Sequence, residues 1–179
     1  FMPNCLSTSY KKLLEEYKLM DVALDTKDST GPIGGKSQEE TLQHFARRFG
    51  VSTCRVESLV LDPCNALGTV SGDLLTSLSC GRVSILDVPC GTGAVGASLL
   101  AGIATLRARG VLPKLPLDVV ITGGDLSGSA LDIYTKMIAE LKPTLGTVGI
   151  NMDLTITEWD AAMPETTARL IDTWFSKST

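Results

Sequence analysis

From residue 82 onward, short runs rich in Val and Ile alternate with longer segments whose apolar residues recur at helical spacing. The strand-like runs cover residues 82–88, 117–122 and 148–157, and the helical segments cover residues 93–109, 129–141 and a last stretch that Pro164 opens. Pro143 is expected to end the second of these helices. Because crossover helices join neighbouring parallel strands, this alternation predicts an α/β fold with a mostly parallel sheet.

The first 80 residues have a different pattern, that of helices joined by polar linkers. Apolar residues recur at helical spacing in two segments: Tyr10, Leu13, Leu14 and Tyr17 in the first, and Leu42, Phe45, Ala46 and Phe49 in the second. Gly50 is expected to end the second helix. Residues 25–36 are polar and Gly-rich, which predicts a loop.

A third helix is predicted to begin at the Asp62–Pro63 pair, with Asp62 as its cap and Pro63 in its first turn. Its buried face would hold six apolar residues: Ala66, Leu67, Val70, Leu74, Leu75 and Leu78. The chain is therefore predicted to consist of a helical N-terminal segment, residues 1–80, in the position of a lid, and an α/β region, residues 81–179.

Composition narrows the function classes. The chain has 16 Lys and Arg against 20 Asp and Glu, a net charge of -4 and no basic tract, so the charge does not support nucleic-acid binding. Its apolar stretches are interrupted well before the roughly 20 residues that a membrane span needs, so no membrane insertion is expected. The five cysteines lie at irregular spacings without a Cys-x-x-Cys pair, which favours a reduced, cytoplasmic setting.

The strongest chemical signal lies where the first predicted strand gives way to a helix. Asp87 ends the strand, and Gly91, Gly93 and Gly96 follow it in the run DVPCGTGAVG. Glycines at such a junction let the backbone turn tightly and let a ligand lie against main-chain N–H groups. A carboxylate beside the loop favours a cationic or amine-bearing ligand and opposes a pyrophosphate.

This run resembles the first motif of the class I methyltransferases that use S-adenosylmethionine, in which an acid precedes a loop of the type D-x-x-C-G-T-G. In that family the second strand ends in an acid that binds the ribose hydroxyls, and here VVITGGD ends in Asp125. A third motif places an Asp with a small neighbour near the adenine, and Glu158-Trp159-Asp160-Ala161 is similar to it. The resemblance implies a Rossmann-like sheet, S-adenosylmethionine as cofactor, and an enzyme that methylates an unidentified acceptor.

The resemblance also implies a set of cofactor-binding residues: Asp87, Pro89, Gly91, Gly93, Asp125, Leu126, Ser127, Trp159, Asp160 and Ala161. The two loop glycines would admit the methionine part, Asp125 would accept two hydrogen bonds from the ribose, and Asp160 would accept one from the adenine amine. Leu126 and Trp159 would contact the ring, and Asp87 would orient the loop. No catalytic residue is implied, because transfer from a sulfonium needs alignment more than acid or base groups.

Each of these roles has a structural alternative. Asp125 could be a turn residue, Asp160 a cap for the last helix, and Trp159 a packing residue. At the level of function, the alternative is a non-catalytic module that binds S-adenosylmethionine for sensing or assembly. An NAD-dependent reductase is less favoured, since Asp125 lies 32 residues after Gly93 whereas the dinucleotide fingerprint places its acid roughly 20 residues on.

Other motif-like segments carry less weight. Residues 31–37 are similar to a phosphate-binding loop, but only three residues separate Gly31 from Gly35 and no strand precedes them. Cys90 follows a proline as some methyltransferase nucleophiles do, yet it belongs to the cofactor loop and is expected to pack. His44 is the only histidine, so no histidine-centred metal site is predicted.

The resemblance covers residues 82–175, and members of the family continue into a fourth strand that pairs with the first. We therefore expect this chain to be the N-terminal portion of a longer methyltransferase domain. Downstream sequence, a second polypeptide or self-association would then complete the sheet beside the strand at residues 83–88. No motif names the methyl acceptor, and the segment 31–36 is a candidate acceptor contact.

Overall fold

The computed structural model describes residues 2–25 and 37–178. Its elements in chain order are α1 (Asn4–Glu16), α2 (Met20–Leu24), α3 (Gln38–Leu61), α4 (Thr69–Ser77), β1 (Gly81–Asp87), α5 (Ala94–Ala108), β2 (Leu117–Asp125), α6 (Gly128–Gly146), β3 (Ile150–Glu158) and α7 (Pro164–Ser178). The strand and helix alternation predicted after residue 82 is therefore confirmed. The predicted loop at residues 25–36, with its candidate acceptor contact at 31–36, lies almost wholly outside the described residues.

The three strands form one parallel sheet in the order β1-β2-β3. The register places the end of β1 beside Gly123 of β2 and places Asp125, the last residue of β2, beside Glu158 of β3. Each strand is joined to the next by a crossover helix, α5 or α6. The predicted α/β class and parallel sheet are thus confirmed, and the carboxyl ends of all three strands lie at the same edge of the sheet.

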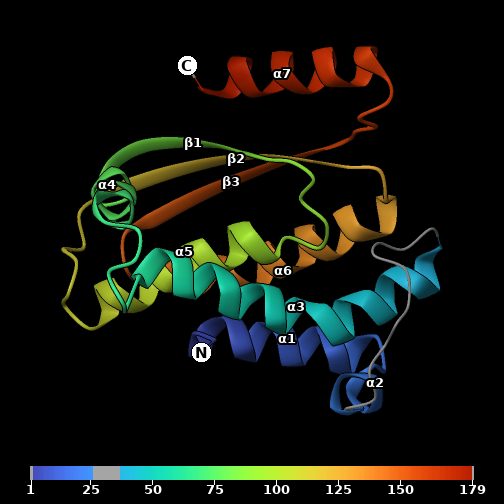
Figure 1. Cartoon of the computed structure of the whole chain (residues 1–179), viewed down its shortest axis with the longest axis horizontal. Helices are drawn as coiled ribbons and strands as arrows, with labels where there is room; N and C mark the ends of the chain where they lie inside the picture. Colours follow the sequence, from blue (N-terminus) through green and yellow to red (C-terminus); the bar gives the residue numbers. More distant parts are fainter. Residues whose placement is uncertain (1, 26–36, 179) are drawn as a thin grey trace.

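The helices cover both faces of this sheet (Figure 1). α5 and α6 pack on one face, α7 lies across the other, and α1 and α3 form a further layer outside α5 and α6. The largest buried cluster joins residues of the N-terminal helices, such as Leu13 and Phe45, to residues of α5, α6 and the sheet. The first 80 residues therefore contribute to the core of the α/β region, and their role as a lid stays a prediction.

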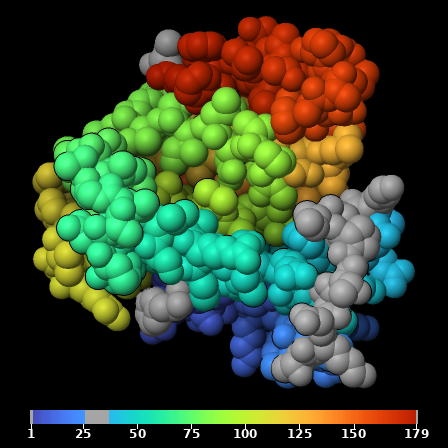
Figure 2. Space-filling view, in the orientation of Figure 1, coloured from blue at the N-terminus to red at the C-terminus, as the bar shows by residue number. Residues whose placement is uncertain are grey.

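The outer edge of β1 has no strand beside it among the described residues. In the space-filling view, the green surface between α7 (red) and α3 (cyan) comes from β1 and the residues that follow it (Figure 2). Leu86 on β1 is 37% exposed, and Phe175 on α7 is 59% exposed. The predicted partner at this edge stays a prediction.

α3 is longer than predicted, because it continues through Gly50 to Leu61. The prediction that Gly50 ends the helix is wrong. A glycine inside a helix costs roughly 1 kcal/mol relative to alanine, and burial of Thr53, Glu57 and Val60 on the following turns offsets this cost. The start of α3 has a capping box between Ser37 and Glu40.

The predicted start of the next helix at Asp62 is also wrong. Asp62 is the C-cap of α3 in the left-handed conformation, and its carboxylate accepts hydrogen bonds from the main-chain N–H groups of Ala66 and Leu67. α4 begins only at Thr69. Of the six residues predicted to be buried, only Leu78 is fully buried, and Val70 is 63% exposed.

Two boundaries in the second half differ from the predictions. α6 contains Pro143 and ends at Gly146, so the proline does not end it. The missing N–H removes one helical hydrogen bond, but Leu145 beyond it is fully buried, which holds the last turn against the core. Val148 is buried in the turn before β3, and Gly149 turns the chain with a φ of 76° before the strand begins.

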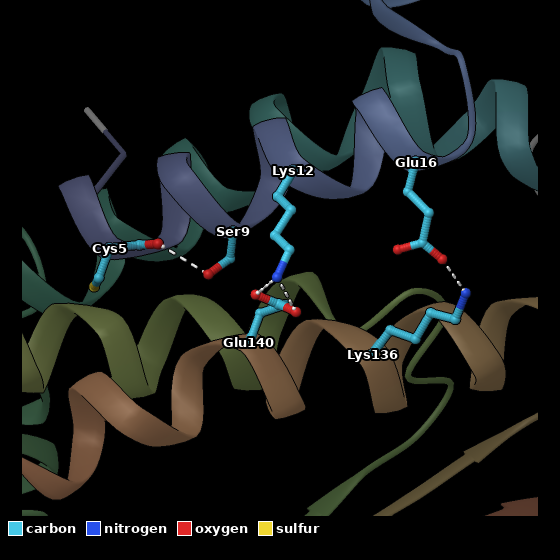
Figure 3. A network of polar contacts seen from close by, with 6 residues as sticks. All are labelled: Cys5, Ser9, Lys12, Glu16, Lys136 and Glu140. Carbon is cyan, nitrogen blue, oxygen red and sulfur yellow. Dashed lines mark hydrogen bonds and ion pairs between the residues drawn. The ribbon is translucent and has the colours of Figure 1, made fainter.

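Ion pairs join the first helix to α6 across more than 100 residues of sequence (Figure 3). The ammonium of Lys12 lies 2.8 Å from the carboxylate of Glu140, and Lys136 pairs with Glu16 one turn further along. All four side chains are substantially exposed, so these pairs orient α1 more than they stabilise it.

Over the described part of the chain, no helix has both the length and the apolar character to cross a membrane.

Candidate functional site

The loops that follow β1, β2 and β3 meet at the carboxyl edge of the sheet, the right-hand end in Figure 1. Asp125 links all three. Its carboxylate accepts hydrogen bonds from the N–H of Gly91 at 2.8 Å and from the N–H of Ser127 at 2.9 Å, and its carbonyl accepts one from the N–H of Trp159 at 3.0 Å. The structure thus brings the three sequence motifs together around one partly buried acid.

Residues 88–93, the ligand loop, satisfy most of their main-chain N–H groups within the protein. The N–H of Cys90 donates to the carbonyl of Gly124, that of Gly91 to the Asp125 carboxylate, and that of Gly93 to the carbonyl of Cys90, all at 2.8–2.9 Å. A pyrophosphate is held by N–H groups that point at the ligand. These three N–H groups are therefore not free to bind a pyrophosphate.

The loop glycines differ in what surrounds them. A Cβ added at Gly91 would meet nothing within 4 Å, and its φ of +53° is one that other residues rarely adopt. A Cβ at Gly93 would lie 1.9 Å from the ring of Tyr134, a fully buried residue of α6. A Cβ at Gly96 would lie 2.0 Å from the hydroxyl of the same tyrosine. Gly91 therefore borders open space, whereas Gly93 and Gly96 make room for Tyr134.

Asp87 is the last residue of β1 and directly precedes the ligand loop. It is 8% exposed, and its Oδ2 accepts a hydrogen bond from the Tyr134 hydroxyl at 3.2 Å. Burial raises the pKa of the Asp87 carboxyl, and the hydrogen bonds from Tyr134 and from the main chain of Gly96 oppose that rise, while the charge of Asp125 adds to it. Asp87 therefore lies where it can orient the loop.

Cys90 is buried between these two acids. Its side chain is 5% exposed, and burial, followed by the charges of Asp87 and Asp125, raises the pKa of its thiol well above the usual range. A thiolate, the nucleophilic form of cysteine, is strongly disfavoured at such a position. The structure therefore agrees with a packing role for Cys90.

Residues of the β2–α6 loop occupy two environments. Leu126 is 64% exposed, so its apolar side chain is accessible to a ligand. Ser127 caps α6 by accepting a hydrogen bond from the N–H of Ala130, and its hydroxyl shares a hydrogen bond with Thr41 of α3 at 3.2 Å. The first turns of α3 thus lie against the candidate site. Pro89, on the ligand loop, is exposed.

In the β3–α7 loop, polar groups of Trp159 and Asp160 form hydrogen bonds within the protein. The indole Nε1 of Trp159 donates to Thr167 of α7 at 3.0 Å. One carboxylate oxygen of Asp160 accepts from the N–H of Ala162 at 2.9 Å, in a turn that leads into α7. Ala161 is exposed. Trp159 and Asp160 therefore both help to attach α7 to the end of β3.

Neither a metal cluster nor a known relative identifies the chemistry of the site. No cluster of three or more His, Cys, Asp or Glu suited to a metal ion occurs within residues 2–25 and 37–178. Comparisons with protein-family models, with curated proteins and with solved structures find no match to this chain. The chemistry of the site must therefore be argued from its own residues.

Tyr134 lies within residues 129–141, which the sequence predicts to be helical, but no motif marks it as a site residue. Its contact with Asp87 joins residues 47 positions apart, so no local pattern could reveal it. The contact between Thr41 and Ser127 spans 86 positions and was missed for the same reason.

Proposed function

We propose that this chain binds S-adenosylmethionine at the carboxyl edge of a Rossmann-like sheet and transfers its methyl group to an acceptor. One observation carries the proposal. Three loops that resemble the family's motifs in order converge on Asp125, and the surface they form carries this carboxylate, which already accepts the N–H groups of Gly91 and Ser127. Such a surface suits a ligand with an ammonium, a sulfonium and a diol, and it repels a pyrophosphate.

Residues of the site fit this ligand in specific places. Gly91 borders open space, as the methionine part requires. Each carboxylate oxygen can accept more than one hydrogen bond, so Asp125 can hold ribose hydroxyls while it binds the N–H groups of Gly91 and Ser127. Leu126 is an exposed apolar side chain next to that acid and suits an adenine ring. These three residues are the core of the proposed site.

The cofactor supplies a methyl group on a positively charged sulfur, which leaves readily. The residues of this chain bind and orient it, so that an acceptor nucleophile can approach the methyl carbon. Gly91, Asp125 and Leu126 would hold the cofactor, which would supply the methyl group that the acceptor takes up in exchange for a proton.

Titration calorimetry with S-adenosylmethionine, S-adenosylhomocysteine and NAD tests the proposal. We expect binding of the first two and none of NAD. Gly91→Asn should weaken binding at least about tenfold, because asparagine tolerates a positive φ and its side chain would enter the space proposed for the ligand. Gly110→Asn is the matched control, since Gly110 has a φ of +73° and open surroundings at the other end of α5.

Binding of NAD alone, or equal affinity of Gly91→Asn and the parent, would refute the assignment. Binding without methyl transfer to any protein, nucleic acid or small-molecule acceptor in a radiolabel assay would favour the non-catalytic sensor or assembly module instead.

A further inference from the structure

The buried tyrosine beneath the ligand loop lies in a space that three glycines leave open. Its ring lies where side chains at Gly93 and Gly96 would clash, and a Cβ at Gly123 on β2 would lie 3.3 Å from the same ring. Tyr134 is 0% exposed. The ligand loop, α5 and β2 thus each place a glycine against this ring. This close packing fixes the position of the ring tightly.

The hydroxyl of this ring points at the acid that ends β1. Tyr134 Oη lies 3.2 Å from Asp87 Oδ2, and a main-chain hydrogen bond from Gly96 reaches the same carboxylate. A buried carboxylate is destabilised when it loses a hydrogen-bond donor, because its desolvated charge then has one partner fewer. Tyr134 therefore controls how Asp87 is held, and Asp87 lies beneath the loop that ends in Gly93.

We propose that Tyr134 is a positioning residue, which acts through Asp87 to hold the ligand loop in its binding conformation. The inference rests on the proposed function for the identity of the ligand, but the contact with Asp87 can be tested without any ligand. Removing the hydroxyl leaves the ring packed among the glycines and leaves Asp87 with one donor fewer.

The sign of the effect follows from the groups around Asp87. Burial and the charge of Asp125 raise the pKa of Asp87, the hydrogen bonds from Tyr134 and Gly96 lower it, and Cys90 faces it as a neutral thiol. Without the tyrosine hydroxyl, the Asp87 carboxyl takes up its proton at a higher pH. As the pH is lowered, ligand binding that needs the ionised acid should then begin to weaken at a higher pH than in the parent.

The experiment compares Tyr134→Phe with the parent by two measurements. The first is the titration of the Asp87 carboxyl carbon by NMR in the ligand-free protein, assigned with Asp87→Asn. The second is the affinity for S-adenosylhomocysteine between pH 5 and pH 8. The matched control is Tyr10→Phe, since Tyr10 is a partly buried tyrosine that donates to the carbonyl of Ala46 at 2.6 Å, far from the loop.

We expect Tyr134→Phe to raise the pKa of Asp87, to weaken binding about tenfold near neutral pH and to move the pH at which affinity falls upward. Tyr10→Phe should change neither measurement, and Asp87→Asn should remove the pH dependence. An unchanged Asp87 titration in Tyr134→Phe, or a raised pKa without any change in the affinity profile, would overturn the proposal.

One outcome separates the contact between Tyr134 and Asp87 from the proposed function. If the parent binds no S-adenosylhomocysteine yet Tyr134→Phe raises the pKa of Asp87, the contact stands, and the ligand assignment and the loop-positioning role built on it both fail. If Tyr134→Phe does not fold, Gly96→Ala provides the second variant, because its methyl group displaces the hydroxyl without removing the ring. It should raise the pKa of Asp87 too, and an unchanged titration in it would overturn the proposal.

Discussion

Glycines 91, 93 and 96 belong to one sequence motif, but they lack side chains for two different reasons. Gly91 borders open space and turns the backbone with a positive φ, which is the property that a ligand loop needs. Gly93 and Gly96 face Tyr134, so a bulky residue at Gly93 would test protein packing and not ligand binding. Ligand experiments therefore belong at Gly91.

Gly96→Ala tests this packing as a matter of stability. The added methyl would lie 2.0 Å from the Tyr134 hydroxyl but 3.2 Å from the ring carbon that bears it, so the substitution should cost on the order of 2 kcal/mol. In Tyr134→Phe the same substitution should cost at least about 1 kcal/mol less, measured by urea unfolding as a double-mutant cycle.

Gly72→Ala is the control for this cycle. Gly72 lies within α4 with nothing near its Cβ position, so alanine should stabilise the protein by up to about 1 kcal/mol. If the two Gly96→Ala costs are equal, Tyr134 does not occupy that space.

Asp125 combines a structural and a proposed binding role. Asp125→Ala removes the acceptor for the N–H groups of Gly91 and Ser127 as well as that proposed for the ribose. We expect a loss on the order of 2 kcal/mol in affinity for S-adenosylhomocysteine by calorimetry, with partial recovery in Asp125→Asn. Asp118→Ala, at the opposite end of the same strand, is the control and should bind normally. An affinity loss below a few tenths of a kcal/mol would leave Asp125 as a turn residue.

At the level of elements, a buried arginine holds together the edge of the sheet opposite the site. Arg107 of α5 is fully buried, and its guanidinium donates to the carbonyls of Ser79, Leu115 and Val148 at 2.6–3.0 Å. These carbonyls precede β1, β2 and β3 respectively. One side chain therefore fixes the start of each strand.

Arg107→Met should destabilise the protein by about 3 kcal/mol or more, because the stem still packs but three carbonyl groups lose their donor. The measurement is urea unfolding, in which the midpoint should fall without a change in slope. The control is Arg109→Met. Arg109 is the exposed C-cap of α5, so this variant should leave the midpoint nearly unchanged. A similar fall for both variants would show that the carbonyl contacts contribute nothing specific.

At the scale of the whole molecule, an acid is buried where the N-terminal helices meet the α/β region. Glu57 of α3 is 4% exposed, and its Oε1 would lie 3.0 Å from a Cβ at Gly102 of α5. Burial, the largest cause, raises the pKa of Glu57 from 4.5 to about 7. We therefore expect the packing of these two layers to depend on pH.

The sign of this dependence follows from proton uptake. Between pH 4.5 and about pH 7 the folded protein keeps a proton on Glu57 that the unfolded chain has lost, so the free energy of unfolding should fall as the pH rises through this range. Glu57→Gln should remove most of this slope, measured by urea unfolding at several pH values. Glu15→Gln, at an exposed position of α1, is the control, and an unchanged slope in Glu57→Gln would contradict the prediction.

The open edge of β1 is the other whole-molecule feature. The predicted completion of the sheet by further polypeptide or by self-association has no test among the described residues. Sedimentation at several concentrations, together with amide hydrogen exchange along β1, would supply one. Protection of every second amide only, in a monomer, would count against that prediction.

The sequence by itself determined those parts of the protein that depend on local periodicity and local backbone chemistry. The strands and crossover helices after residue 82, the helix that begins at Pro164 and the glycine-rich turn after Asp87 all follow from patterns within about ten residues. The positions of Asp125 and Asp160 at strand ends follow from the same patterns, although the ligand that they serve stays a proposal.

Only the tertiary structure decided where local and long-range effects compete. α3 passes through Gly50 and α6 passes through Pro143, because burial of the next turn outweighs an unfavourable local residue. Asp62 ends a helix although its spacing predicts a start. Tyr134 reaches Asp87, and Gly91 reaches Asp125, across 47 and 34 residues. Such contacts arise when the sheet brings distant segments together, and no local pattern in the sequence records them.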